Sequence, residues 1–147
     1  MFRKILLAYD GSEGANRALE VALAEARVHQ AELWALAVEE RLPRFSATVD
    51  EVQEEKTFAN QHYGKLLAAA QARAQEAGIE VKTLLRAGHP AKTIIDVAKE
   101  GNFDLLLIGA SGLSGLWRFL GTTTEKVVRH APCSVVIVRP GEEEEGS

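Results

Sequence analysis

The chain contains one cysteine, Cys133, so an internal disulfide is excluded. Because Cys133 precedes an apolar stretch, we expect a small packed side chain rather than a reactive thiol. No apolar run approaches the roughly 20 residues that a membrane span needs, so no membrane partner is expected. The first residues enter an apolar segment of strand length directly and do not resemble a signal peptide. We therefore expect a cytoplasmic location.

An excess of positive charge is also missing. The net charge is −4, with 17 Lys and Arg against 21 Asp and Glu. Four of the acids are Glu142 to Glu145, which leaves 17 acids to balance 17 bases in the rest of the chain. A nucleic-acid partner is therefore not expected. We expect residues 1–140 to form a single domain and the acidic tail 141–147 to be disordered.

Apolar runs of strand length alternate with stretches of helical period along the chain. The expected strands are 4–9, 32–38, 81–85, 104–108 and 134–138. The first expected helix follows the turn 10–14 and runs to about residue 29, and the others are 51–77, 90–100 and 123–130. Strict alternation predicts an α/β fold with helices on both faces of a parallel sheet. We expect a doubly wound sheet of five strands in the order 3-2-1-4-5. The runs Ile5–Ala8 and Leu105–Ile108 are apolar throughout, as is typical of central strands buried on both sides.

Ligands of such folds bind outside the carboxyl ends of the strands, where the winding reverses. In this order the crevice lies between strands 1 and 4, beside the turn Asp10–Ser12 and the loop that begins at Gly109. Asp10 with Glu13, or Ser12 alone, is expected to cap the first helix. Thr122 and Glu125 predict a capping box at the last helix, whose start offers amides and a dipole to phosphate. A turn before an ordinary capped helix explains the same residues equally well.

Motifs of several enzyme classes are missing. The chain has no G-x-x-x-x-G-K-[ST] phosphate loop, and the turn after the first strand is not G-x-G-x-x-G. His29, His62, His89 and His130 make no metal-binding spacing with one another, and no serine has a visible base and orienting acid. Neither a general base nor a cationic finger is recognisable, so at most slow phosphoryl transfer is expected.

Several segments, in this order, resemble the universal stress protein family over residues 1–140: Ile5–Ser12, Gly88–Pro90, Asp104–Gly109, Gly112–Gly115, Glu125–Cys133 and Val135–Val138. The resemblance implies the doubly wound fold of the adenine-nucleotide hydrolase type and a role as a stress-response regulator that binds ATP or AMP. It also implies a homodimer through the strand Ser134–Val138, whose apolar edge needs cover. The protein partner that would receive the signal is unknown.

The resemblance also implies where the nucleotide lies. Asp10 would lie near the ribose and near any Mg²⁺ that accompanies the nucleotide, and Ala8 and Val38 would lie near the adenine. The phosphates would meet a loop of the pattern G-x2-G-x9-G-[ST]. The residues that the resemblance assigns to the nucleotide are Ala8, Tyr9, Asp10, Val38, Gly109, Ala110, Ser111, Gly112, Gly121, Thr122 and Thr123.

The loop departs from the family pattern, because eight residues rather than nine separate Gly112 from Gly121. Eight extended residues, at about 3.3 Å each, still span a phosphate group, so we expect nucleotide binding. The family also contains members that lack the loop and bind no ATP. A dimeric interaction module without nucleotide is therefore the alternative function. An ATP-using enzyme of the related hydrolase group ranks third, because the turn after the first strand reads Asp-Gly-Ser-Glu-Gly rather than S-G-G-x-D-S.

Overall fold

The computed structural model describes residues 1–40, 49–110 and 121–139, with the backbone alone for residues 49–59. In chain order the elements are β1 (Lys4–Ala8), α1 (Glu13–His29), β2 (Glu32–Glu40), α2 (Val49–Glu76), β3 (Val81–Gly88), α3 (Pro90–Glu100), β4 (Leu105–Gly109), α4 (Thr122–His130) and β5 (Ser134–Val138). The strands form one parallel sheet in the order β3-β2-β1-β4-β5. This confirms the predicted doubly wound α/β fold.

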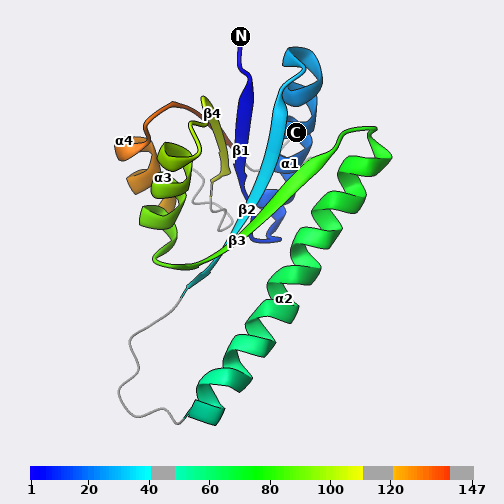
Figure 1. The fold of residues 1–147 in the computed structure, drawn as a ribbon. Coiled ribbons are helices and arrows are strands. Elements are labelled where there is room, and N and C mark those ends of the chain that lie inside the picture. Colours follow the sequence, from blue (N-terminus) through cyan, green and yellow to red (C-terminus); the bar gives the residue numbers. More distant parts are fainter. Residues whose placement is uncertain (41–48, 111–120, 140–147) are drawn as a thin grey trace, which may run out of the picture.

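Helices cover both faces of the sheet. In Figure 1, α1 and α2 lie on one side of the strands, and α3 and α4 lie on the other. In β1, Ile5 and Leu7 face the α1 side and Leu6 faces the α3 side, and all three side chains are fully buried. Burial on both faces explains why this strand is apolar at every position. In the part of the chain that the structure describes, no helix combines the length and the apolar character that a membrane span needs.

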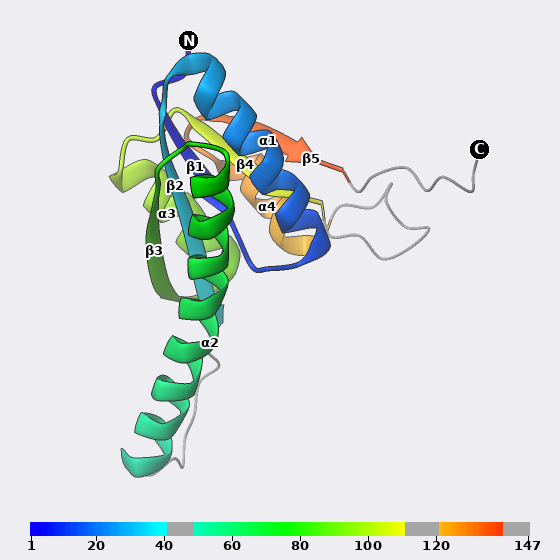
Figure 2. The ribbon, with the colours of Figure 1, turned by 90° about the vertical axis from the view of Figure 1, so that its right-hand side faces the viewer.

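Small side chains let α1 pack closely against the sheet. The buried residues of α1 are Ala15, Ala18, Leu19, Ala22, Leu23 and Ala26. In α2 the buried positions are Leu67, Ala70 and Ala74, whereas Tyr63 and Leu66 are only partly covered. The first turns of α2 extend beyond the carboxyl ends of the strands (Figure 2). Partial burial of Tyr63 and Leu66 therefore reflects their position where the helix leaves the sheet.

Strands β2 and β3 continue further than the sequence predicted. They stay paired from Leu33 opposite Val81 to Glu40 opposite Gly88. The prediction ended β2 at Val38 because polar residues follow, yet an exposed polar side chain does not interrupt a backbone ladder. The extension matters for function, because it carries β2 past the end of its other neighbour, β1.

Cys133 lies just before β5 and is partly buried against the residues that α3 and α4 cover. Burial, together with the nearby Asp104 carboxylate, raises the pKa of its thiol and so favours the unreactive protonated form. This placement fits the packing role expected from the sequence.

Candidate functional site

The carboxyl edge of the sheet is notched at β1. This strand ends at Ala8 opposite Leu36, while β2 continues to Glu40 and β4 continues to Gly109. The chain then leaves β1 toward α1 on one face and leaves β4 toward α4 on the other face (Figure 1). The winding of the sheet therefore reverses between these two strands, which is where doubly wound folds form their ligand crevice.

A cavity of about 650 Å³ occupies this notch, a volume typical of small-molecule sites. Nine of the eleven residues singled out from the sequence line it: Ala8, Tyr9, Asp10, Val38, Gly109, Ala110, Gly121, Thr122 and Thr123. The other two, Ser111 and Gly112, lie outside the described residues. The fold thus brings the ends of β1, β2 and β4 and the start of α4 around one space.

One wall of the cavity is apolar. It consists of Leu36 and Val38 from β2, Ile108 from β4, and Pro90 and Ile94 from the start of α3. The side chains of Leu36, Ile94 and Ile108 are buried, so the wall is held by the core behind it. Such a wall suits a flat, weakly polar ring better than a sugar or a phosphate.

Backbone polar groups of β2 border this wall. The Tyr9 N–H donates to the Leu36 carbonyl at 2.8 Å, just as β1 ends. Alternate residues of a strand point their N–H and C=O groups to the same side, so those of Val38 point like those of Leu36. At Val38, however, β1 no longer lies on that side, while β3 still pairs on the other. Val38 therefore presents one donor and one acceptor at the cavity edge.

The opposite end of the cavity is the start of α4. Gly121 is the N-cap, Thr122 is the first helical residue, and among the described residues no side chain caps the first turn. The predicted capping box is therefore wrong. Thr122 lies inside the helix rather than at its cap, and the Glu125 carboxylate instead accepts from Arg129 at 3.1 Å. The first-turn amides are left available, and together with the helix dipole they favour an anion.

Gly109 lies where α1, β4 and α4 meet. A Cβ atom there would lie 2.6 Å from the backbone carbon and oxygen of Gly14 and 3.1 Å from the Ala15 nitrogen. On the α4 side, the buried Thr124 hydroxyl donates to the Gly109 carbonyl at 3.3 Å. The resemblance assigned Gly109 to the nucleotide. In the structure, the space beside it is taken by helix α1.

The turn after β1 resolves the two capping alternatives. The Ser12 hydroxyl caps α1 by accepting from the Ala15 N–H at 3.1 Å. The Asp10 Oδ1 atom accepts from the Ser12 N–H at 2.9 Å and so shapes the turn before the helix, where Gly11 takes a φ of +80°. Asp10 is exposed at the cavity wall, and among the described residues its second oxygen makes no hydrogen bond. That oxygen is available to a ligand.

Tyr9 also lines the cavity, but its hydroxyl is directed elsewhere. The side chain is buried, and the hydroxyl donates to the Asn16 Oδ1 atom at 2.5 Å. Burial and the neighbouring Asp10 raise the pKa of the Tyr9 hydroxyl, so it stays neutral. Tyr9 therefore fixes the start of α1 and offers its ring and backbone to the cavity.

Comparison with known proteins assigns the chain to a family. The model of the Universal stress protein family matches residues 1–139. The chain belongs to the universal stress protein family. A universal stress protein of Thermus aquaticus is 37% identical over 144 residues, which cover 95% of this chain and 100% of the relative.

Solved universal stress proteins share the fold. The structure of UspA from Lactobacillus plantarum is 32% identical, with a TM-score of 0.82 over 94% of this chain and 98% of that chain. A universal stress protein in complex with cAMP is 24% identical, with a TM-score of 0.75 over 95% of this chain and 99% of that chain. One from Arabidopsis thaliana with AMP bound is 21% identical, with a TM-score of 0.73 over 97% and 94%. The last two similarities show the fold alone.

Some residues that line the cavity were not predicted from the sequence to do so. Leu36, Ile94 and Ile108 were expected only as core, and nothing in the sequence indicated that His62 and Tyr63 of α2 would line the same space. The two rings stack edge-on with centroids 5.0 Å apart. Of the four histidines, His62 lines the cavity, whereas His89 is the exposed N-cap of α3. Within the described ranges, no three His, Cys, Asp or Glu residues gather to hold a metal ion.

Proposed function

We propose that this universal stress protein is a regulator that binds an adenine nucleotide, AMP or ATP, in the cavity at the carboxyl ends of β1, β2 and β4. One observation carries the proposal: a single cavity combines an apolar wall, a backbone donor and acceptor at Val38, and the uncapped start of α4. A purine needs the first two features and a phosphate needs the third. The fold relatives that hold cAMP and AMP support the adenine class.

In this proposal the adenine lies against Leu36, Val38 and Ile108, and its edge pairs with the Val38 backbone. The ribose lies at Asp10, whose second oxygen accepts from a hydroxyl group. The phosphates lie at Gly121–Thr123, beside Gly109 and Ala110. Ser111 and Gly112, which the resemblance also assigns to the phosphates, lie outside the described residues. The donor set fits Mg²⁺ only in the company of a nucleotide, because Asp10 alone would be joined by phosphate oxygens.

The site is suited to binding rather than to rapid phosphoryl transfer. Among the lining residues that the structure describes, none is a Lys or Arg that would stabilise a transferring phosphoryl group. We infer that nucleotide occupancy, rather than turnover, carries the signal to a protein partner in a cytoplasmic stress response. Any hydrolysis of ATP is expected to be slow.

Replacing Asp10 by alanine is expected to weaken AMP binding by about tenfold, because a charge-assisted hydrogen bond to the ribose is lost. The stability cost should be only about 1 kcal/mol, since α1 keeps its Ser12 cap. Ser12→Ala is the matched control, because it should cost a similar stability and leave AMP affinity within about twofold. Calorimetry and urea unfolding measure both quantities. Equal loss of affinity in the two variants would mean that Asp10 acts only through the turn.

We also propose that the protein forms a homodimer through β5. This strand lies at the edge of the sheet, and its side chains are only partly covered. The Val138 carbonyl accepts from the Ala110 N–H toward β4 at 2.9 Å. By the alternation of strand residues, the backbone groups of Val135 and Ile137 therefore point to the free edge. An apolar edge with unpaired backbone groups is stabilised by pairing with a second copy.

Val135→Pro is expected to give a monomer, because proline removes an outward N–H while the bonds to β4 remain. Val135→Ala removes the side chain but keeps the N–H, and it should remain dimeric. Light scattering at a concentration on the order of tens of micromolar distinguishes these states. A monomeric wild-type protein would contradict the dimer, and a dimeric proline variant would place the interface elsewhere.

Calorimetry of the wild-type protein with AMP and with ATP tests the function itself. Binding with a Kd on the order of micromolar to a few hundred micromolar is expected. The loop between Gly112 and Gly121 is one residue shorter than the family pattern. This favours the alternative function, a dimeric interaction module that binds no nucleotide. Absence of heat with either nucleotide at millimolar concentration, in a protein that is dimeric, would establish that alternative.

A further inference from the structure

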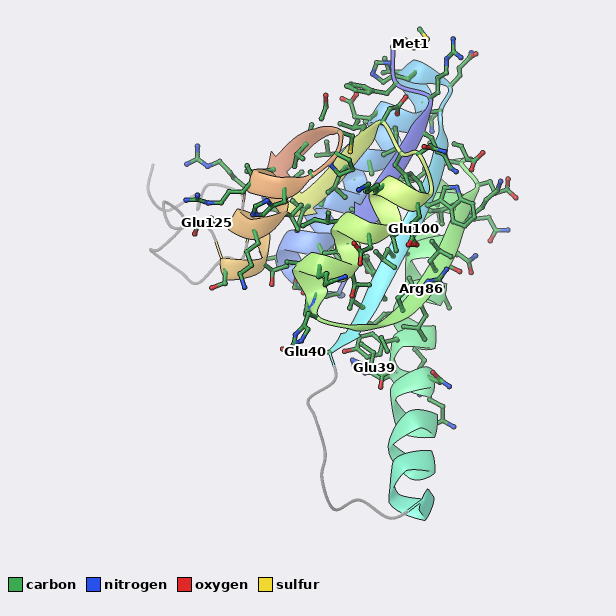
Figure 3. The ribbon with its side chains drawn as sticks, turned by 60° about the vertical axis from the view of Figure 1, so that its left-hand side comes forward. Met1, Glu39, Glu40, Arg86, Glu100 and Glu125 are labelled. Carbon is green, nitrogen blue, oxygen red and sulfur yellow. The ribbon has the colours of Figure 1, made fainter. Side chains whose placement is uncertain are left out.

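The charge of the cavity indicates which form of the nucleotide it accepts. Three carboxylates line it: Asp10 after β1, Glu13 in the first turn of α1, and Glu40 at the end of β2. Figure 3 shows Glu40 and its neighbour Glu39 where β2 ends. The described residues that line the cavity include neither a Lys nor an Arg, and His62 is the basic side chain among them. The described part of the cavity wall therefore carries negative charge toward a ligand that is itself an anion.

Among the described residues, no ion pair neutralises these carboxylates. Glu13 and Glu40 form no salt bridge among the described residues, and Asp10 accepts only from the backbone of Ser12. Two of these carboxylates, Asp10 and Glu40, influence Tyr63, which lines the same cavity. The pKa of its hydroxyl is raised first by burial and then by Glu39, Glu40 and Asp10. The acidic groups thus act across the space that a ligand would fill.

Glu13 lies in the turn of α1 that adjoins the end of β4. It precedes Gly14, where a Cβ atom would lie 2.9 Å from the Ala110 carbonyl oxygen. The start of α4 offsets only about half an elementary charge. A phosphate monoester already carries about −1.5 to −2, and each further phosphate adds to it. Repulsion between the carboxylates and the phosphates therefore grows from AMP to ATP, while the attraction from the start of α4 stays limited.

We propose that Asp10, Glu13 and Glu40 make the site select its nucleotide by charge, so that adenine ligands of low negative charge bind better than metal-free ATP. The inference rests on the proposed function. Glu13 is the residue that sets the discrimination at the phosphate end. A divalent cation such as Mg²⁺ on the phosphates lowers the ligand charge and restores ATP binding.

Calorimetry of adenosine, AMP and ATP in EDTA at low salt tests this selection. ATP is expected to bind at least about tenfold more weakly than AMP, and the gap should narrow with excess Mg²⁺ or at about 0.5 M salt, because exposed charges are screened. Glu13→Gln should strengthen metal-free ATP binding about fivefold and leave adenosine binding within about twofold. Glu100→Gln is the control, since Glu100 ends α3 at the far end from the cavity (Figure 3).

The outcomes separate this inference from the proposed function. Equal affinity for ATP and AMP in EDTA would overturn charge selection and leave nucleotide binding intact. An equal effect of Glu13→Gln on adenosine and on ATP would also overturn it, because the change would then act through structure rather than charge. If adenosine, AMP and ATP all fail to bind the folded wild-type protein, the proposed function and the charge selection are both wrong.

Discussion

Gly109→Ala is expected to destabilise the protein by about 3 kcal/mol, at the upper end of what overpacking costs. The added Cβ atom would lie 2.6 Å from the backbone of Gly14, a distance that no rotamer change can relieve. Either α1 must move away from β4 or the strand must bend, and both changes open the core behind Ala15 and Ala18. Urea unfolding followed by circular dichroism measures the loss.

Gly64→Ala is the matched control. Gly64 lies within α2, and a Cβ atom there would meet nothing within 4 Å. The same substitution should therefore stabilise the protein by about 0.5–1 kcal/mol, through the better helix propensity of alanine. A Gly109→Ala variant as stable as the wild type would show that α1 does not pack at this distance. The absence of a side chain at Gly109 would then be explained by contact with the nucleotide, to which the resemblance assigns this residue.

Thr122→Pro is expected to weaken AMP binding by about tenfold or more without unfolding α4. Proline is favoured at the first helical position, and Gly121 has a ψ of 159°, which suits the residue before a proline. The substitution therefore removes one backbone N–H from the proposed phosphate site while the helix persists. A hydrogen bond to a charged group contributes about 1.5–3 kcal/mol, which sets the expected loss.

Thr122→Ala keeps the N–H and removes only the hydroxyl, so its AMP affinity should stay within about threefold of the wild type. Adenosine, which has no phosphate, should bind both variants as it binds the wild type. Calorimetry with both ligands checks the pair. If the proline variant binds AMP normally, or loses adenosine to the same degree, the phosphate does not lie at the start of α4.

The fold was predictable because its signals are local and repeated. Apolar runs such as Ile5–Ala8 are typical of strands buried on both faces, and the alternation with helices leaves few arrangements of a parallel sheet. The strand ends were less predictable. Glu39 and Glu40 continue β2 because the backbone of β3 pairs with them, and that pairing has no hydrophobic signature.

The site was predictable in part. The sequence placed Asp10, Val38 and Gly121 at one crevice, and the cavity contains all three. It could not place Tyr63, because the point at which a long helix leaves the sheet depends on tertiary packing. The capping box failed for a physical reason as well. A T-x-x-E pattern fits either a cap or the first turn, and α4 begins one residue earlier, at Thr122.

The central claim is that an adenine nucleotide binds between the end of β2 and the start of α4. Titration of the ¹⁵N-labelled protein with AMP, followed by the backbone amide signals, tests it most directly. The account predicts saturable shifts of the Val38 amide and of the amides of Thr122 and Thr123, because these groups would contact the base and the phosphate. Ribose 5-phosphate should shift the α4 amides but not Val38. Shifts confined to β5, or none with AMP at millimolar concentration, would contradict the account.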